Sequence, residues 1–188
     1  MRMQFFGDSY DIVKHLLLKW LRHYGEWSLH PMFTHKVSAR EVADYEALLG
    51  ARVISQEVLL GTTDRAKYLA VAERSGNLFL DPDTGLKLKR CRSRSGEYLF
   101  ADELVTLATN RPTALTMVFD HSLPRGREEP SLKAKMEHLS NKGVSCFAYV
   151  SHASFIIASI DRDLVRNVQQ YVIAESHLPS ERFPCVLA

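Results

Sequence analysis

The sequence predicts an α/β protein built on a mostly parallel sheet. Short apolar runs alternate with amphipathic stretches of about 12 residues, which is the pattern of consecutive βαβ units. Near the end, two apolar runs are separated only by a short polar link containing Ser151 and His152, which predicts an antiparallel C-terminal hairpin. A third observation is the run Leu78–Leu80, which leads straight into Asp81, as expected where a buried strand delivers polar side chains to a sheet edge.

Length and composition predict one soluble domain over residues 1–188, with residues 178–188 as a polar tail. The 188 residues suffice for a full core, and the 46% apolar and 24% charged fractions are ordinary for a globular protein. A net charge of only +2 gives no overall field that attracts a polyanion. Three scattered cysteines without CxxC spacing predict reduced thiols and no zinc site, hence a cytoplasmic location. No apolar run reaches the length of a membrane span or a signal peptide, so we expect no membrane contact.

The first third of the chain predicts strands and helices in alternation. The run 3–6 predicts a short strand, and Asp8 or Ser9 caps a first helix. Its apolar stripe follows helical spacing, with Lys14 away from or beside it; the stripe comprises Val13, Leu16, Leu17, Trp20 and Leu21. A strand is expected over 26–32.

The next helix starts at Ser38, which forms a capping box with Glu41, and it ends at Gly50. The remaining elements follow in order: a strand over 52–60, a helix over 64–75, a strand over 78–80, a basic loop over 87–96, a helix over 98–109, a strand over 114–119, a helix from Pro130 to Gly143, hairpin strands over 144–150 and 153–159, and a last helix capped by Asp161. This order predicts a Rossmann-like three-layer sandwich.

Acidic side chains follow several of the predicted strands. Asp8 follows the first apolar run, Asp81 and Asp83 follow another, and Asp120 follows a third. Because parallel strands end at one edge of the sheet, these carboxylates are expected to converge there. Carboxylate oxygens suit Mg²⁺ or Mn²⁺, so these four residues are the predicted metal ligands.

Two histidines and a basic run complete the predicted site. His121 and His152 are candidate general acids or bases, together with Asp81 and Asp83 as catalytic carboxylates. The basic run directly behind the acidic pair is expected to meet the phosphates of a nucleic acid or nucleotide; it comprises Lys87, Lys89, Arg90, Arg92 and Arg94. Simpler alternatives stay open, namely a helix cap at Asp8, turn chemistry at 81–85, a hydrogen-bonded turn at His152 and a solvated basic loop.

Two short motifs resemble class I amino-methyltransferases, nearest to the bacterial enzymes that methylate adenine N6 in ribosomal RNA. The helix start Asp11–His15 is similar to the D-x-x-K-H of that family, and Asp81–Thr84 is similar to its D-P-P-Y tetrapeptide. The resemblance implies a methyltransferase-like fold, with Lys14 near the S-adenosylmethionine donor and Asp81 accepting from the target amine. Asp83 and Thr84 depart from the family's second proline and aromatic residue, and the stretch 29–34 lacks the glycines of its donor loop.

The whole chain also resembles an uncharacterised bacterial family with F-G-D and D-P-D-[NT]-G signatures, here Phe6–Asp8 and Asp81–Gly85. Three functions therefore stay open. The first expectation is a divalent-metal-dependent nuclease or phosphodiesterase. The alternatives are an S-adenosylmethionine-dependent nucleic-acid methyltransferase with a degenerate donor site, and a catalytically inactive Rossmann-like binding protein. The sequence does not determine the oligomeric state.

Overall fold

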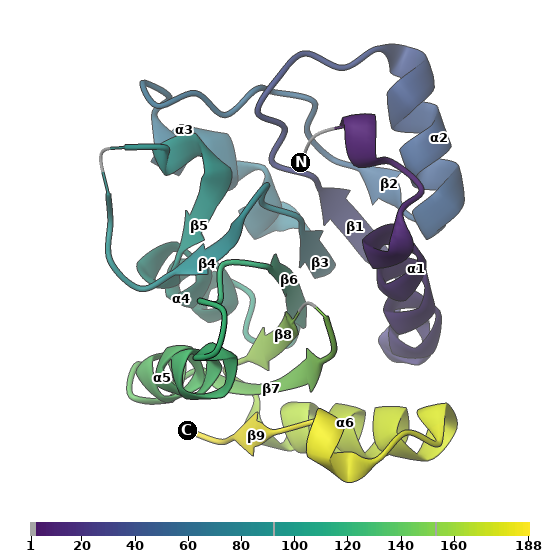
Figure 1. The fold of residues 1–188 in the computed structure, drawn as a ribbon, viewed down its shortest axis with the longest axis vertical. Helices are drawn as coiled ribbons and strands as arrows, with labels where there is room; N and C mark the ends of the chain where they lie inside the picture. The colour runs from purple at the N-terminus through teal and green to yellow at the C-terminus, as the bar shows by residue number, and fades with distance from the viewer. Residues whose placement is uncertain (1–2, 92, 153) are drawn as a thin grey trace.

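The computed structural model describes residues 3–91, 93–152 and 154–188. It is a mixed α/β structure around a seven-stranded sheet of order β2-β1-β3-β6-β8-β7-β9 (Figure 1). The strands are β1 (Trp27–His30), β2 (Arg52–Val53), β3 (Asn77–Leu80), β6 (Thr116–Asp120), β7 (Ser145–Val150), β8 (Ser154–Ser159) and β9 (Cys185–Val186).

Most strands of this sheet point the same way. β2, β1, β3 and β6 pair in parallel, and β7 has the same direction because β8 is antiparallel to both β6 and β7. β8 therefore lies inside the sheet, and the short strand β9 forms the edge beside β7. A mostly parallel sheet with helices agrees with the predicted α/β class and is consistent with a Rossmann-like fold.

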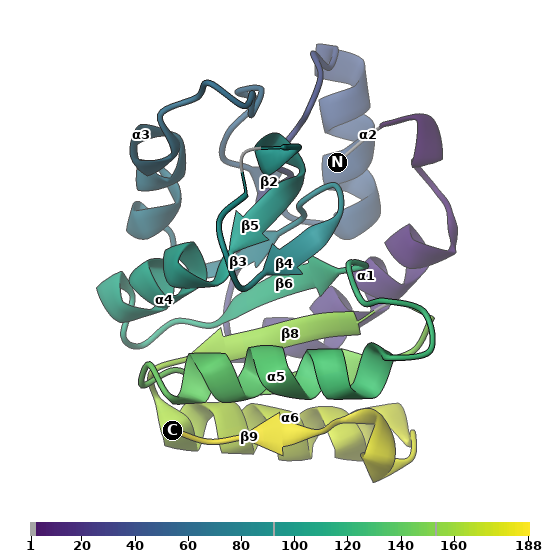
Figure 2. The same cartoon turned by 60° about the vertical axis from the view of Figure 1, so that its left-hand side comes forward.

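Helices cover both faces of the sheet (Figures 1 and 2). One face carries α1 (Ser9–Leu21), α2 (Ala39–Leu49) and α6 (Arg162–Ser176), and the other carries α3 (Arg65–Ala70), α4 (Ala101–Asn110) and α5 (Glu128–Ser140). Successive strand residues alternate between the two cores, as the pleat requires: Phe79 packs with the first group, whereas Leu78 and Leu80 pack with the second. The result is three layers.

A small second sheet lies beside the exit of β6. It pairs β4 (Gly85–Lys87) in parallel with β5 (Tyr98–Phe100). The predicted helix over 98–109 is therefore wrong at its start, because its first three residues form β5 and α4 begins at Ala101. The two ends of the predicted basic loop 87–96 have regular secondary structure, since Lys87 ends β4 and Gly96 lies in a 3₁₀ turn.

Two further predictions near the N-terminus are wrong. The run 3–6 forms a 3₁₀ turn, Met3–Phe5, and leaves Phe5 and Phe6 exposed instead of adding a strand. Helix α1 is rotated relative to the predicted stripe, since Leu16 is exposed whereas Lys14 is buried. The physical reason is that Lys14 forms ion pairs with Asp11 in the same helix and with Asp81 after β3, which make its burial favourable.

The C-terminal tail is part of the fold. Phe183 is buried, and the following residues pair with β7 as β9. Among the described residues, no helix is long and apolar enough to cross a membrane.

Candidate functional site

A cavity of about 340 Å³ opens where β3 and β6 end and α1 begins. Three of the four predicted metal ligands line it, namely Asp8, Asp81 and Asp83. The predicted residues Lys14, Arg94 and His121 line it as well, and aromatic side chains form much of the remaining wall: Phe5, Tyr10 and Phe119. The expected convergence at the carboxyl edge of the sheet therefore holds for these residues, and we call this space the rim cavity.

The deepest part of the rim cavity is a buried ionic cluster. The Lys14 Nζ donates to Asp11 Oδ1 and to Asp81 Oδ2, each at 2.8 Å. The Tyr45 hydroxyl donates to the same Asp81 Oδ2, also at 2.8 Å. Among the described residues, no hydrogen bond is made to Asp81 Oδ1, so this oxygen is left as an acceptor. The cluster fixes the orientation of the Asp81 carboxylate and leaves it one oxygen for a ligand.

Burial and charge together determine the protonation states in this cluster. Burial alone would lower the pKa of Lys14, but the adjacent Asp81 and Asp11 carboxylates outweigh it and raise this pKa above its usual value of 10.5. Burial and the Asp81 charge raise the pKa of Tyr45 well above 10. Near neutral pH, Lys14 is therefore a cation and Tyr45 a neutral hydrogen-bond donor.

Asp8 is the N-cap of α1. Its Oδ1 accepts from the backbone N–H groups of Tyr10 and Asp11 at 2.9 and 3.1 Å. Asp11, in the first turn of α1, accepts in turn from the residue before the cap, since its Oδ2 lies 2.9 Å from the Gly7 N–H group that donates to it. Asp8 therefore acts as a helix cap, as one of the predicted alternatives had it, and the same residue also lines the rim cavity.

Asp120 lies apart from the rim cavity and forms a second ionic cluster. Its Oδ2 accepts from Lys135 Nζ at 2.6 Å, and its Oδ1 accepts from the Ser122 hydroxyl at 2.6 Å and from the Leu86 N–H at 3.2 Å. Gly85 is required beside it, because a Cβ at Gly85 would lie 2.2 Å from Asp120 Oδ1. Asp120 therefore fastens β4 and α5 to the end of β6, and this arrangement does not place it with the other three carboxylates.

The two predicted histidines both contact the ring of Tyr10. The Tyr10 ring centroid is 5.1 Å from that of His121 and 4.5 Å from that of His152. His121 Nε2 is 3.2 Å from the Tyr10 hydroxyl, and His152 Nε2 is 3.3 Å from the Ser9 hydroxyl. These rings come from α1 and from the loops after β6 and β7, and we call the set His121, Tyr10 and His152 the aromatic platform.

The predicted basic run does not form one surface in the structure. Arg94 lines the rim cavity and pairs with Glu97, whereas Arg90 lies over Phe100 near Glu103 and borders another hollow. Lys87 lies over the Tyr98 ring at 4.5 Å, and Lys89 is exposed. Arg92 lies outside the described residues.

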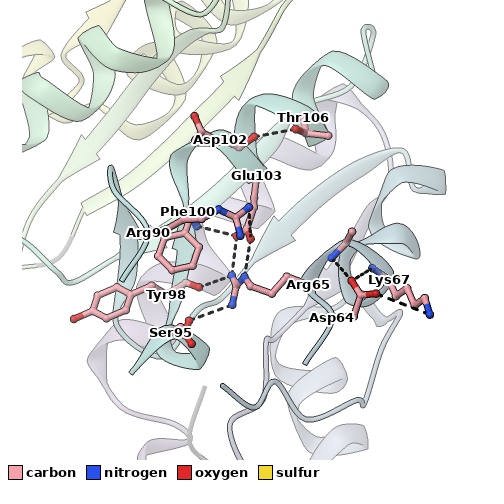
Figure 3. Close-up of polar contacts among 11 residues, drawn as sticks. Asp64, Arg65, Lys67, Arg90, Ser95, Tyr98, Phe100, Asp102, Glu103 and Thr106 are labelled. Carbon is pink, nitrogen blue, oxygen red and sulfur yellow. Dashed lines mark hydrogen bonds and ion pairs between the residues drawn. The ribbon is translucent and has the colours of Figure 1, made fainter. Parts of the chain in front are cut away.

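The second hollow is dominated by a structural ion pair. Figure 3 shows Arg65 reaching from α3 to both carboxylate oxygens of Glu103, with N–O distances of 2.6 and 2.7 Å, and to the backbone oxygen of Tyr98. With a fourth hydrogen bond to the backbone oxygen of Ser95, Arg65 ties α3 to β5 and α4. We assign this region to the scaffold.

Sequence reasoning did not identify three residues that shape these clusters: Tyr10, Tyr45 and Lys135. Tyr45 sits on an apolar helix face, where a tyrosine is expected simply as core. Asp11 appeared only within the D-x-x-K-H motif, although its spacing of three from Lys14 places both on one helix face and signals the pair.

The donor site implied by the methyltransferase resemblance does not fit this chain. The residues after β1 are buried side chains, with Met32 and Phe33 fully covered, and no glycine opens the backbone there. These residues do not line the rim cavity. For metals, no three His, Cys, Asp or Glu side chains gather in a suitable group within the described ranges.

Comparison with known proteins gives no further assignment: no family model, curated protein or solved structure matches this chain. The methyltransferase resemblance and the predicted metal site therefore stay predictions.

Proposed function

We propose that the protein binds the nucleoside part of a nucleotide or nucleic acid in the rim cavity, with the amino group of the base on Asp81. The observation that carries this proposal is the oriented Asp81 carboxylate, with one oxygen held by Lys14 and Tyr45 and the other left as an acceptor, next to an aromatic wall. Aromatic rings stack on bases, and a buried carboxylate oxygen accepts from an exocyclic amine.

The charges of the cavity favour the base over the phosphates. Among the described residues, four carboxylates line it, at Asp8, Asp11, Asp81 and Asp83, against the two cations Lys14 and Arg94. An anionic phosphate would be repelled by this excess of negative charge, whereas a neutral base with N–H donors would not. The phosphates of a bound nucleotide are therefore expected outside the cavity.

Because the residues after β1 do not fit the adenosyl group of S-adenosylmethionine, we derive no methyl-transfer step. The proposed activity is binding without catalysis. It retains one contact that the methyltransferase resemblance implies, in which Asp81 accepts a hydrogen bond from the amino group of a base.

A second candidate is the divalent-metal-dependent phosphodiesterase, favoured by the same excess of carboxylates. Mg²⁺ is commonly held by one or two carboxylates and several waters, and Asp8, Asp81 and Asp83 are the residues that would hold it. A bound ion would supply charge neutralisation for a phosphate. Both oxygens of Asp11 and one oxygen each of Asp8 and Asp81 already accept from protein donors, so we favour the nucleoside proposal.

The test is thermal stabilisation of the folded protein by adenosine, inosine, S-adenosylhomocysteine and MgCl₂, measured separately. We expect adenosine to raise the melting temperature and inosine, which carries an oxygen in place of the amine, to do so much less. Stabilisation by MgCl₂ alone would favour the phosphodiesterase. No stabilisation by adenosine at millimolar concentration, or by cytidine measured in the same way as a second base with an exocyclic amine, would contradict the proposal.

Asp81→Asn gives a sharper version of the same experiment. Lys14 and Tyr45 both donate, so they orient the carbamoyl oxygen of Asn toward themselves and its NH₂ toward the ligand. The preference for adenosine over inosine should therefore fall at least tenfold or invert. Asp120→Asn is the matched control, since it changes an equally buried strand-end carboxylate outside the rim cavity.

A further inference from the structure

The aromatic platform lies at the rim cavity but is larger than one bound base requires. Tyr10 and His121 line the cavity, whereas His152 is exposed and its ring makes a tilted contact with Tyr10, with the two centroids 4.5 Å apart. Phe5 also lines the cavity, with more than half of its surface exposed, and Phe6 beside it in the sequence is exposed as well. These exposed rings at and near the cavity offer stacking surface to the bases next to one that is bound in it.

Exposed cationic side chains also lie around this cavity, in contrast to the buried carboxylates of Asp11 and Asp81 inside it. Arg94 lines the cavity mouth with an exposed side chain, although it also pairs with Glu97. Arg182 donates to the backbone oxygen of Val150, two residues before His152, and is exposed. Phosphates on either side of an inserted base would meet these cations instead of the carboxylates of Asp8 and Asp83.

We propose that the ligand is a single-stranded nucleic acid, with one base in the rim cavity, the next base stacked on the aromatic platform at His152, and the backbone between them on the side of Arg94 and Arg182. This inference rests on the proposed nucleoside site. Stacking on aromatic side chains together with backbone cations is the general mode of single-strand binding, and it tolerates different sequences because every base has a π-face.

The experiment measures dissociation constants of AMP and of fluorescent oligonucleotides of two, four and eight residues, as both RNA and DNA, for the full chain. We expect the dinucleotide or tetranucleotide to bind at least tenfold more tightly than AMP. We also expect His152→Ala to remove most of this gain while leaving AMP binding unchanged, because His152 does not line the cavity. Oligonucleotide affinity should fall with added salt more steeply than AMP affinity.

His23→Ala is the matched control, because His23 stacks on Tyr171 at 4.3 Å and is similarly exposed, at the opposite end of α1. It should leave all affinities unchanged. If AMP binds and the oligonucleotides bind no more tightly, the single-strand inference is wrong and the nucleoside site stands. If His152→Ala and His23→Ala behave alike, the aromatic platform does not bind a base. If neither AMP nor any oligonucleotide binds, both proposals are wrong.

Discussion

Asp81 and Asp120 occupy equivalent places in the sheet yet have different surroundings. Each directly follows or ends a central parallel strand, is almost fully buried and forms an ion pair with a buried lysine. Both oxygens of Asp120 accept from protein donors, whereas among the described residues only one oxygen of Asp81 does. Asp81 also lines the rim cavity and Asp120 does not. A strand-end carboxylate is thus a candidate for ligand binding only if the surrounding chain leaves it an acceptor.

The largest expected effect comes from removing the cation of the Asp120 cluster. Lys135→Met leaves the Asp120 charge buried without its partner, which should cost about 3–5 kcal/mol of unfolding free energy. Urea unfolding measures this cost. Lys135→Met together with Asp120→Leu should recover part of it. A loss below about 1 kcal/mol would contradict the assignment of this cluster to the scaffold.

The next effect depends on pH and on His30, which ends β1 beside Asp81. Its backbone oxygen accepts from the Asp81 N–H at 3.1 Å, and burial lowers the pKa of its ring from 6.5 to about 4. Between these values the unfolded chain binds a proton and the folded chain does not. Protonation of His30 in the unfolded chain therefore lowers the unfolding free energy as the pH falls. The loss is absent above pH 6.5 and reaches about 3 kcal/mol at pH 4.

Unfolding free energies measured from pH 7 to pH 4 test this prediction. His30→Leu should show a shallower decline over that window than the wild-type protein. Equal slopes for the two proteins would mean that His30 is protonated in the folded state.

Tyr45→Phe removes one of the two donors to Asp81 and has a smaller expected effect. A hydrogen bond to a charged group contributes about 1.5–3 kcal/mol, and Lys14 still holds the carboxylate. Chemical denaturation gives the stability change. Weaker adenosine binding should accompany it, because the carboxylate is less fixed. Tyr24→Phe, at an exposed hydroxyl that donates to the Asn167 backbone, is the control and should change binding little.

The smallest expected effect distinguishes the cap from a metal ligand at Asp8. Asp8→Ala removes the acceptor for two N–H groups of α1 and should cost about 1 kcal/mol of unfolding free energy. Asp8→Ser keeps a cap and should restore most of this loss. If MgCl₂ stabilises the wild-type protein and Asp8→Ser abolishes that stabilisation, the metal function of Asp8 is favoured instead.

Local sequence signals determined much of this fold. The capping box of Ser38 and Glu41 formed as predicted, Asp161 capped α6, and the apolar run 78–80 became the core of β3. These features depend on residues within one or two turns of each other, so their chemistry can be read from adjacent positions. Strand direction likewise predicted that Asp81 and Asp83 reach the carboxyl edge of the sheet, whereas Asp8 reaches the same cavity as the N-cap of α1 and not at the end of a strand.

Only the tertiary structure decided which of those side chains face a common cavity. The pairing of Lys14 with Asp81 spans 67 positions, and that of Lys135 with Asp120 depends on how α5 packs against β6. Burying a lysine is unfavourable unless such a partner is present, so the periodicity of α1 alone placed Lys14 away from or beside the apolar stripe and did not predict its burial. The aromatic platform likewise joins three segments that are distant in sequence. Long-range partners determine the orientation of polar side chains, and a single sequence does not specify those partners.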